Sequence, residues 1–237
     1  MKQLFLTFIL LVSLLIEMKA QTVQNVDAVK FKELIAVGDA ILLDVRTPQE
    51  YSRGHIAGST AINIADPDFV PKVQLLQKDK TILVYCLSGS RSDAAASYMS
   101  RMGFKKLYTL RQGIMTWTRQ GYPLEESSAV VASTSKTYTE QSFGQLLKDN
   151  KLVLVDFHAV WCAPCKAMSP VIDKVSSDFK GKAWVEKVDV ENNKVITKAY
   201  QVQTIPGFVL FKEGKKVWSY NGIISYTDLA GIIKKYL

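Results

Sequence analysis

The stretch at residues 151–165, Lys-Leu-Val-Leu-Val-Asp-Phe-His-Ala-Val-Trp-Cys-Ala-Pro-Cys, decides the fold predicted for the second half of the chain. Its apolar, β-branched run at 152–157 is typical of a buried strand, and the Cys-x-x-Cys that follows is expected at the start of a helix. A helix start favours a thiolate, because unpaired N–H groups and the helix dipole place positive partial charge there. We therefore predict that Cys162 is a nucleophile and that Cys165 lies close enough to form a short disulfide with it.

A Cys-x-x-Cys pair can instead supply half of a zinc site. Zinc in structural sites takes four ligands. Besides this pair the chain offers only Cys86, His55 and His158, and it has no second Cys-x-x-Cys. A redox role is therefore favoured, and the sequence predicts no metal and no other cofactor.

Three segments of the second half, Asp156-Phe157, Trp161 to Cys165 and Thr204-Ile205-Pro206, together resemble thioredoxin over about residues 137–237. The resemblance implies a thioredoxin fold in which Asp156 lies buried beneath the cysteines and assists proton transfer at Cys165. A carboxyl group in an apolar setting has a raised pKa, which suits that role near neutral pH.

The same resemblance implies a cis proline at Pro206 facing the disulfide, and we expect Trp161, Ile205 and Pro206 to contact the substrate. Lys187 matches a family lysine near the buried carboxylate. His158 stands where thioredoxins usually carry tryptophan, and we expect it to fill a gap in the packing rather than to titrate.

The first half has its own cysteine in a well-defined setting. The runs at 41–45 and 81–85 are typical of buried strands, Thr47-Pro48-Gln49-Glu50 is a capping box, and 92–102 is helix-like. Cys86 ends the second strand and opens a loop of small residues, whose successive N–H groups are expected to form an anion nest. Cys86 at the floor of that nest is predicted to be held as a thiolate.

This half resembles a single-domain rhodanese over about residues 25–126. The resemblance rests on three stretches, 44–58 (Asp-Val-Arg-Thr-Pro-Gln-Glu-Tyr onward to Gly-His-Ile-Ala-Gly), the loop 86–91 (Cys-Leu-Ser-Gly-Ser-Arg) and 113–117 (Gly-Ile-Met-Thr-Trp). It implies that Cys86 takes a sulfane sulfur from a donor and carries it as a persulfide. Four further residues match positions that chiefly stabilise the fold in rhodaneses: Asp44, Arg46, Glu50 and His55.

The loop is expected to bind the donor through Leu87, Ser88, Gly89, Ser90 and Arg91. For Arg91 two roles stay open, binding the loop carbonyls or contacting the substrate anion. The related phosphatases and arsenate reductases use a longer loop with five residues between Cys and Arg, so a phosphatase is disfavoured. A non-basic residue at 87 leaves thiosulfate, polysulfides and organic persulfides open as donors. A small core cysteine at a strand end is the structural alternative for Cys86.

The first twenty residues have the layout of a secretory signal: Met1-Lys2, an apolar run at 4–16, and a cut most plausible after Ala20. Thirteen apolar residues fall short of the roughly 20 that span a bilayer, so no stable membrane anchor is expected. The formal charge is +8, but the lysines form scattered pairs without a basic run, so nucleic-acid binding is not predicted.

The sequence thus predicts an exported, periplasmic or extracellular α/β protein: signal peptide 1–20, a rhodanese-like parallel-sheet domain at 25–126, a Ser/Ala/Thr-rich linker at 127–136 and a thioredoxin-fold domain at 137–237. The expected activity is sulfur transfer to Cys86, reduction of the persulfide by the Cys162/Cys165 pair, and reduction of that pair by an external thiol protein. The alternatives are a general disulfide reductase or isomerase whose rhodanese domain is a docking or sulfur-sensing module, and a non-enzymatic sensor.

Overall fold

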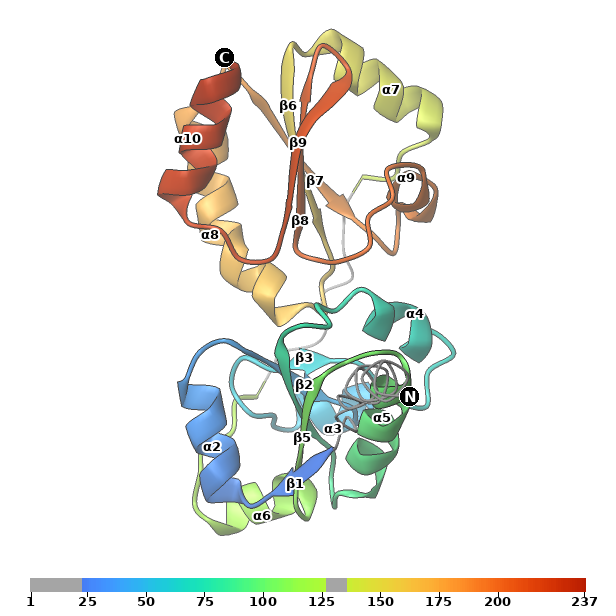
Figure 1. Ribbon diagram of the computed structural model, residues 1–237, viewed down its shortest axis with the longest axis vertical. Helices are drawn as coiled ribbons and strands as arrows, with labels where there is room; N and C mark the ends of the chain where they lie inside the picture. The colour runs from blue at the N-terminus through green and yellow to red at the C-terminus, as the bar shows by residue number, and fades with distance from the viewer. Residues whose placement is uncertain (1–22, 127–135) are drawn as a thin grey trace, which may run out of the picture.

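The computed structural model describes residues 23–126 and 136–237, which form two α/β domains that contact each other end to end (Figure 1). This is the fold class predicted from the sequence. The predicted signal segment lies outside the described residues, as does all of the predicted linker except its last residue. Within 23–126 and 136–237, no helix has the length and hydropathy needed to cross a membrane.

The first domain is built on a parallel sheet with the strand order β1-β5-β4-β2-β3. Its strands are β1 (Gln24–Val26), β2 (Ala40–Asp44), β3 (Thr60–Ala61), β4 (Thr81–Tyr85) and β5 (Lys106–Leu110). Its helices are α2 (Ala28–Ala36), α3 (Pro48–Ser52), α4 (Phe69–Gln74), α5 (Ser90–Arg101) and α6 (Gly113–Arg119).

Alternation along the strands divides the core of the first domain into two layers. Ile82 and Val84 of β4 join the buried cluster that includes α4 and α5, whereas Leu83 and Tyr85 join the cluster that includes α2 and α6. Figure 1 shows these helix pairs on opposite faces of the sheet. A sheet that is covered on both faces needs continuous apolar strands, which is what the sequence has at 81–85.

Local signals set two helix starts in the first domain. The capping box at Thr47 is confirmed, because its side chain accepts the Glu50 N–H while the Glu50 carboxylate accepts the Thr47 N–H. Helix α5 begins at Ser90, two residues before the start predicted from the sequence. The reason is that the Asp93 N–H already donates to the Gly89 carbonyl at 3.0 Å, which makes Gly89 the N-cap, and the Ser92 hydroxyl donates to the same carbonyl at 2.7 Å.

The second domain has a mixed sheet with the order β7-β6-β8-β9, in which β6 is parallel to β7 and antiparallel to β8. Its strands are β6 (Leu152–His158), β7 (Trp184–Asp189), β8 (Gly207–Lys212) and β9 (Lys215–Asn221). Its helices are α7 (Glu140–Asp149), α8 (Ala163–Asp178), α9 (Lys194–Ala199) and α10 (Tyr226–Tyr236). The apolar run at 152–157 is the central strand β6, as predicted.

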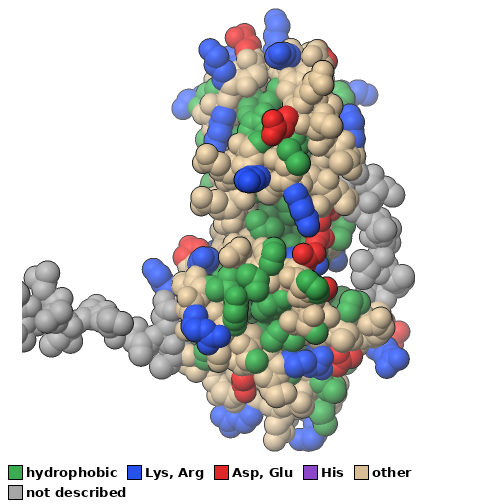
Figure 2. Space-filling view, turned by 90° about the vertical axis from the view of Figure 1, so that its right-hand side faces the viewer, with side chains coloured by type: hydrophobic (Ala, Val, Ile, Leu, Met, Phe, Trp, Pro, Cys, Tyr) green, Lys and Arg blue, Asp and Glu red, His purple; other side chains and the backbone are tan. Residues whose placement is uncertain are grey.

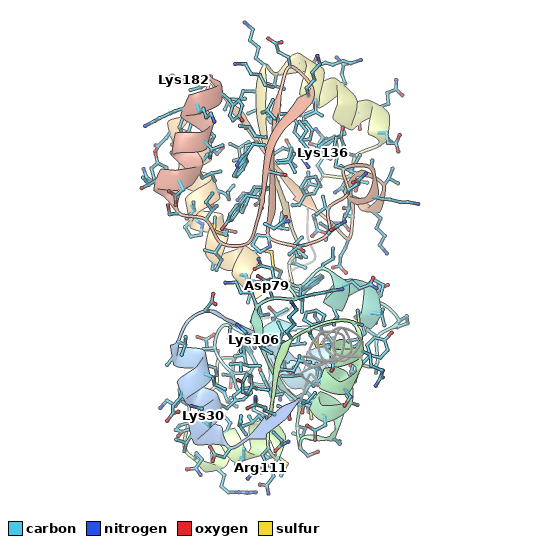
Figure 3. All side chains as sticks on the ribbon, viewed as in Figure 1. Lys30, Asp79, Lys106, Arg111, Lys136 and Lys182 are labelled. Atoms are coloured by element: carbon cyan, nitrogen blue, oxygen red, sulfur yellow. A yellow bond between two sulfur atoms is a disulfide. The ribbon has the colours of Figure 1, made fainter. Side chains whose placement is uncertain are left out.

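The domains meet where the start of α8 lies against β3 (Figure 1), and where Leu75, just after α4, contacts Ile205, just before β8. One cluster of buried apolar side chains includes members from both domains, among them Val73 and Leu76 of the first domain and Trp161 and Ile205 of the second. Figure 2 views the side that carries α4 and α9, where apolar and charged side chains gather at the junction. Asp79, labelled in Figure 3, lies at this junction.

A buried ion pair stabilises the end of β2. The Arg46 guanidinium donates to both Asp44 oxygens at 2.7–3.0 Å and to the Gly54 carbonyl at 2.7 Å, and both side chains are almost fully buried. Removing one partner of such a pair leaves the other charge buried without compensation. The pair therefore ties the end of β2 to the segment after α3.

Asp44→Ala is expected to lower the free energy of unfolding of the first domain by about 3–5 kcal/mol. Asp39→Ala, which breaks an exposed pair with Lys80, is the matched control and should cost at most about 1 kcal/mol. Urea unfolding followed by circular dichroism measures both. Equal losses in the two variants would contradict a stabilising role for the buried pair.

Candidate functional site

Cys86 occupies the turn between β4 and α5, and its side chain is 0 % exposed. Its Sγ accepts the Gly89 N–H at 3.1 Å and the Ser92 hydroxyl at 3.6 Å. The sulfur therefore lies under the first turn of α5, where N–H groups and the helix dipole favour negative charge. The position of Cys86 at a strand end, in a turn into a helix, is as the sequence predicted, and its role as a thiolate stays a prediction.

Helix α6 holds the cysteine loop from behind. Its Ile114 N–H donates to the Cys86 carbonyl at 2.8 Å, and its Met115 N–H donates to the Leu87 carbonyl at 3.3 Å. Gly113 has φ +60°, and a Cβ there would lie 2.4 Å from the Cys86 carbonyl oxygen. Only glycine fits this close approach. The sequence marked Gly113 as part of a family motif but did not reveal that it supports the cysteine loop.

The loop residues predicted to bind the donor differ in exposure. Leu87, Ser88 and Ser90 are exposed at the surface, whereas Gly89 is buried. Their part in donor binding stays a prediction.

Arg91 is not bound to the loop carbonyls, which corrects one of the two roles left open for it. Among the described residues its guanidinium donates to the two Glu50 oxygens, at 2.6 and 2.8 Å. These hydrogen bonds are the main cause that lowers the pKa of Glu50 to about 2. The capping box fixes Glu50 at the start of α3, so Arg91 links α5 to α3. Contact of Arg91 with the substrate anion stays a prediction.

The Cys-x-x-Cys pair lies at the junction of β6 and α8, and it forms the predicted disulfide. Cys162 is the N-cap of α8, its Sγ accepts the Cys165 N–H at 3.2 Å, and the two Cα atoms are 5.2 Å apart. Pro164 lies in the first turn, where its missing N–H costs nothing. The Ile205–Pro206 bond is cis, as the resemblance implied.

Asp156 lies inside the domain on β6, and burial raises its pKa to about 7. Its Oδ1 has no hydrogen-bond partner among the described residues. Lys187, its neighbour across the strands, opposes the shift, but the Lys187 amine pairs with Asp173 at 2.5 Å. A carboxyl group with this pKa exchanges a proton near neutral pH, which is the property that the predicted role requires.

His158 ends β6 and is only partly buried. It lines a cavity together with Cys165, whereas we expected it to fill a gap in the packing. Burial lowers its pKa, with Asp189 acting in the opposite direction, so the imidazole is neutral at pH 7. In the described part of the chain, no group of three or more His, Cys, Asp or Glu side chains is placed to hold a metal ion.

Comparison with known proteins assigns both halves. A rhodanese-like domain model matches residues 27–120, and a thioredoxin model matches residues 134–235. The thioredoxin of Pyropia yezoensis is 36% identical over 100 residues, which are 42% of this chain and 94% of the relative. The chain is a rhodanese-like domain fused to a thioredoxin. It therefore combines a sulfurtransferase family with a thiol-disulfide oxidoreductase family.

This chain is also similar to two further proteins. The thioredoxin of Synechocystis sp. is 36% identical over 106 residues, or 44% of this chain and 99% of the relative. A rhodanese-related protein of known structure from Thermoplasma volcanium is 32% identical, with a TM-score of 0.40, and the match covers 44% of this chain and 99% of that one.

The rhodanese-like domain contacts the thioredoxin domain next to the disulfide. The Ala163 N–H donates to the Thr60 hydroxyl at 3.1 Å, and the Ile205 N–H donates to the Leu75 carbonyl at 2.9 Å. Ile205 was predicted to contact substrate, and in this structure its N–H is taken by the first domain. The sequence carries no signal for these contacts, because Thr60 and Leu75 are unremarkable residues more than 100 positions away.

Two cavities open between the domains in the described chain, one of about 1200 Å³ and one of about 570 Å³. Both are lined by Trp161, Lys72 and Glu191, and the smaller one also by Cys165. The Trp161 Nε1 is buried and has no hydrogen-bond partner among the described residues. Trp161 was predicted to contact substrate, and it lines both cavities, of which only the smaller one reaches Cys165.

Gly113→Ala is expected to disturb the Cys86 loop, because the new Cβ meets the Cys86 carbonyl and the backbone stays at positive φ. The rhodanese-like domain should lose about 2–3 kcal/mol of stability, and alkylation of Cys86 in the folded protein should change in rate. Gly121→Ala, also at positive φ but with open space around its Cβ, is the control and should cost only about 1 kcal/mol. Equal effects would show that the contact with Cys86 is unimportant.

The stability of the thioredoxin domain should fall as the pH rises from about 4 to 7, because unfolding returns the raised pKa of Asp156 to its usual 3.8. The folded state holds the proton over this window and the unfolded state releases it. Asp156→Asn should therefore be more stable than the wild type at pH 8, by up to about 4 kcal/mol, and should lose this advantage at pH 4. Urea unfolding at the two pH values tests this, and a pH-independent difference would contradict it.

Proposed function

We propose that the chain is an exported sulfurtransferase coupled to a thiol-disulfide oxidoreductase. Cys86 accepts a sulfane sulfur as a persulfide from a small donor, which is thiosulfate, a polysulfide or an organic persulfide. The Cys162/Cys165 pair then reduces the persulfide and releases sulfide. An external thiol protein reduces the pair again.

The observation that carries this proposal is that Cys86 and Cys162 each lie at the start of a helix, in two domains of one chain that contact each other. Cys86 follows β4, whereas the thioredoxin domain contacts Thr60, the first residue of the edge strand β3, and Leu75, which precedes β4. Only β2 separates β4 from β3, and all three strands are parallel. Because Asp79 at the junction precedes β4 and Cys86 follows it, these two residues lie at opposite ends of that strand. The fusion keeps both cysteine sites in one chain, and sulfur transfer has to bridge the separation between them.

The reduction of the persulfide balances in two steps. The Cys162 thiolate attacks the outer sulfur of the Cys86 persulfide, which transfers that sulfur to Cys162 and leaves Cys86 as a thiolate. The Cys165 thiolate then attacks Cys162 Sγ, forms the disulfide and displaces hydrosulfide. Two thiols are oxidised and one sulfane sulfur is reduced to sulfide. Asp156 takes up the proton of Cys165 when that thiol becomes the attacking group.

We call the transfer of sulfur from Cys86 to Cys162 the relay. It needs motion between the domains, because Cys86 and Cys162 are both 0 % exposed. Of the residues described, neither cysteine lines either of the two cavities at the junction. Transfer within one chain is favoured by the high effective concentration that a covalent link provides.

A second candidate function is a disulfide reductase or isomerase whose rhodanese-like domain is a docking or sulfur-sensing module. The observation that favours it is the pair of hydrogen bonds that Thr60 and Leu75 accept beside the disulfide. The two candidates differ in whether sulfur on Cys86 ever reaches Cys162.

Cys86→Ser is expected to abolish sulfide release from a polysulfide while leaving reduction of the Cys162–Cys165 disulfide by a small dithiol within two-fold of wild type. Cys165→Ser should instead stall after transfer and keep one added sulfur atom on Cys162, because the resolving thiol is missing. Sulfide assays and mass spectrometry of the loaded protein measure these outcomes. If sulfur on Cys86 never oxidises Cys162 and Cys165, the relay is false and the docking or sensing function holds.

A further inference from the structure

The disulfide of this chain is closed off by its own rhodanese-like domain. The side chains of Cys162 and Cys165 are 0 % and 4 % exposed, although they begin a helix at the end of the thioredoxin domain. A redox-active disulfide has to be reached by another sulfur atom before it can react. What covers it therefore decides which reductants it meets.

Two backbone N–H groups of the thioredoxin domain, one of them next to Cys162, are occupied by the rhodanese-like domain. Ala163 follows Cys162 directly, and its N–H is bound by the Thr60 hydroxyl. Ile205 precedes the cis Pro206, and its N–H is bound by the Leu75 carbonyl. A protein partner that presents acceptors to this face has to displace both contacts first.

An ion pair joins the domains at the rim of this contact. The Lys72 amine lies 3.2 Å from a Glu191 carboxylate oxygen, and the two side chains are 19% and 31% exposed. Lys72 belongs to α4 and Glu191 follows β7, so the pair bridges the two domains. A half-buried pair is screened less by salt than an exposed one.

One opening toward the Cys162–Cys165 disulfide remains. The cavity of about 570 Å³ is lined by Cys165 and by residues of both domains, including Tyr51, His158 and Lys166. Its size suits a small molecule and is too small for a folded protein. Small thiols therefore have a route to the disulfide in the docked arrangement.

We propose that the rhodanese-like domain is a cap on the oxidised thioredoxin site, which admits small thiols and sulfur anions and excludes protein thiols until the domains undock. The Lys72–Glu191 pair and the contacts of Thr60 and Leu75 hold the cap closed. In each reduction a dithiol becomes a disulfide, and the Cys162–Cys165 bond takes up two electrons and two protons. The proposal rests on the thiol–disulfide part of the proposed function and not on sulfur transfer from Cys86.

The test compares two reductants on the oxidised full-length chain, all variants carrying Cys86→Ser so that no sulfur transfer contributes. Dithiothreitol is the small dithiol, and reduced Synechocystis thioredoxin is the protein dithiol. Acid quenching, alkylation and mass spectrometry give the rate of reduction of the Cys162–Cys165 bond. The relay can fail in other experiments without changing this result, because Cys86 is absent here.

Lys72→Glu places two carboxylates together and should open the cap. We expect the rate with the protein dithiol to rise at least five-fold and the rate with dithiothreitol to change less than two-fold. The double variant Lys72→Glu/Glu191→Lys restores an ion pair of reversed polarity and should return to the wild-type rates. Lys194→Glu, the same charge change at an exposed position lining the larger cavity, is the matched control and should behave as wild type.

Thr60→Val removes one acceptor and keeps the side-chain shape, so it should also raise the protein-dithiol rate selectively. Small-angle X-ray scattering of Lys72→Glu should show a larger radius of gyration than wild type. The cap is wrong if the wild type reacts with the protein dithiol as fast as both opened variants. It is also wrong if the reversed pair stays as fast as Lys72→Glu.

Discussion

Parallel strands all end at the same edge of their sheet, and the placement of Cys86 relative to the domain junction depends on that constraint. In the rhodanese-like domain, the carboxyl ends of β2, β3 and β4 lead into Arg46, Ile62 and Cys86 at one edge of the sheet. The buried Asp44–Arg46 pair stabilises that edge from within. The thioredoxin domain docks instead on the edge strand β3 and on the segment before β4, which supplies Leu75. Strand direction therefore places the Cys86 loop and the domain junction at different ends of β4.

The two domains position their cysteines in the same way, although their sheets differ. In each, a cysteine follows a buried strand and its sulfur accepts the N–H of the residue three positions later, from Gly89 at 3.1 Å and from Cys165 at 3.2 Å. The N–H groups of a helix start would otherwise lack partners. What differs is the third element, since α6 supports the loop of Cys86, whereas the cis Pro206 segment and the docked domain surround Cys162.

Local signals in the sequence predicted what short segments decide. The strands at 81–85 and 152–157, the capping box at Thr47 and the 162–165 disulfide depend on neighbours within a few residues, and all are confirmed. The raised pKa of Asp156 was predictable because it follows from burial on a central strand. The pairing of Arg91 with Glu50 was not, since the two residues lie 41 positions apart and only the fold brings them together. The contact between the domains depends on surface shape, which no local pattern encodes.

The contacts beside the disulfide are made mostly by main-chain atoms. The donors are the backbone N–H groups of residues 163 and 205, and one acceptor is the carbonyl of Leu75. Every residue except proline has an N–H, and every residue has a carbonyl. Side chains at these positions are therefore able to drift through evolution without breaking the contacts. Related fusions can therefore share the docked arrangement even where their sequences differ at the residues in the centre of this contact.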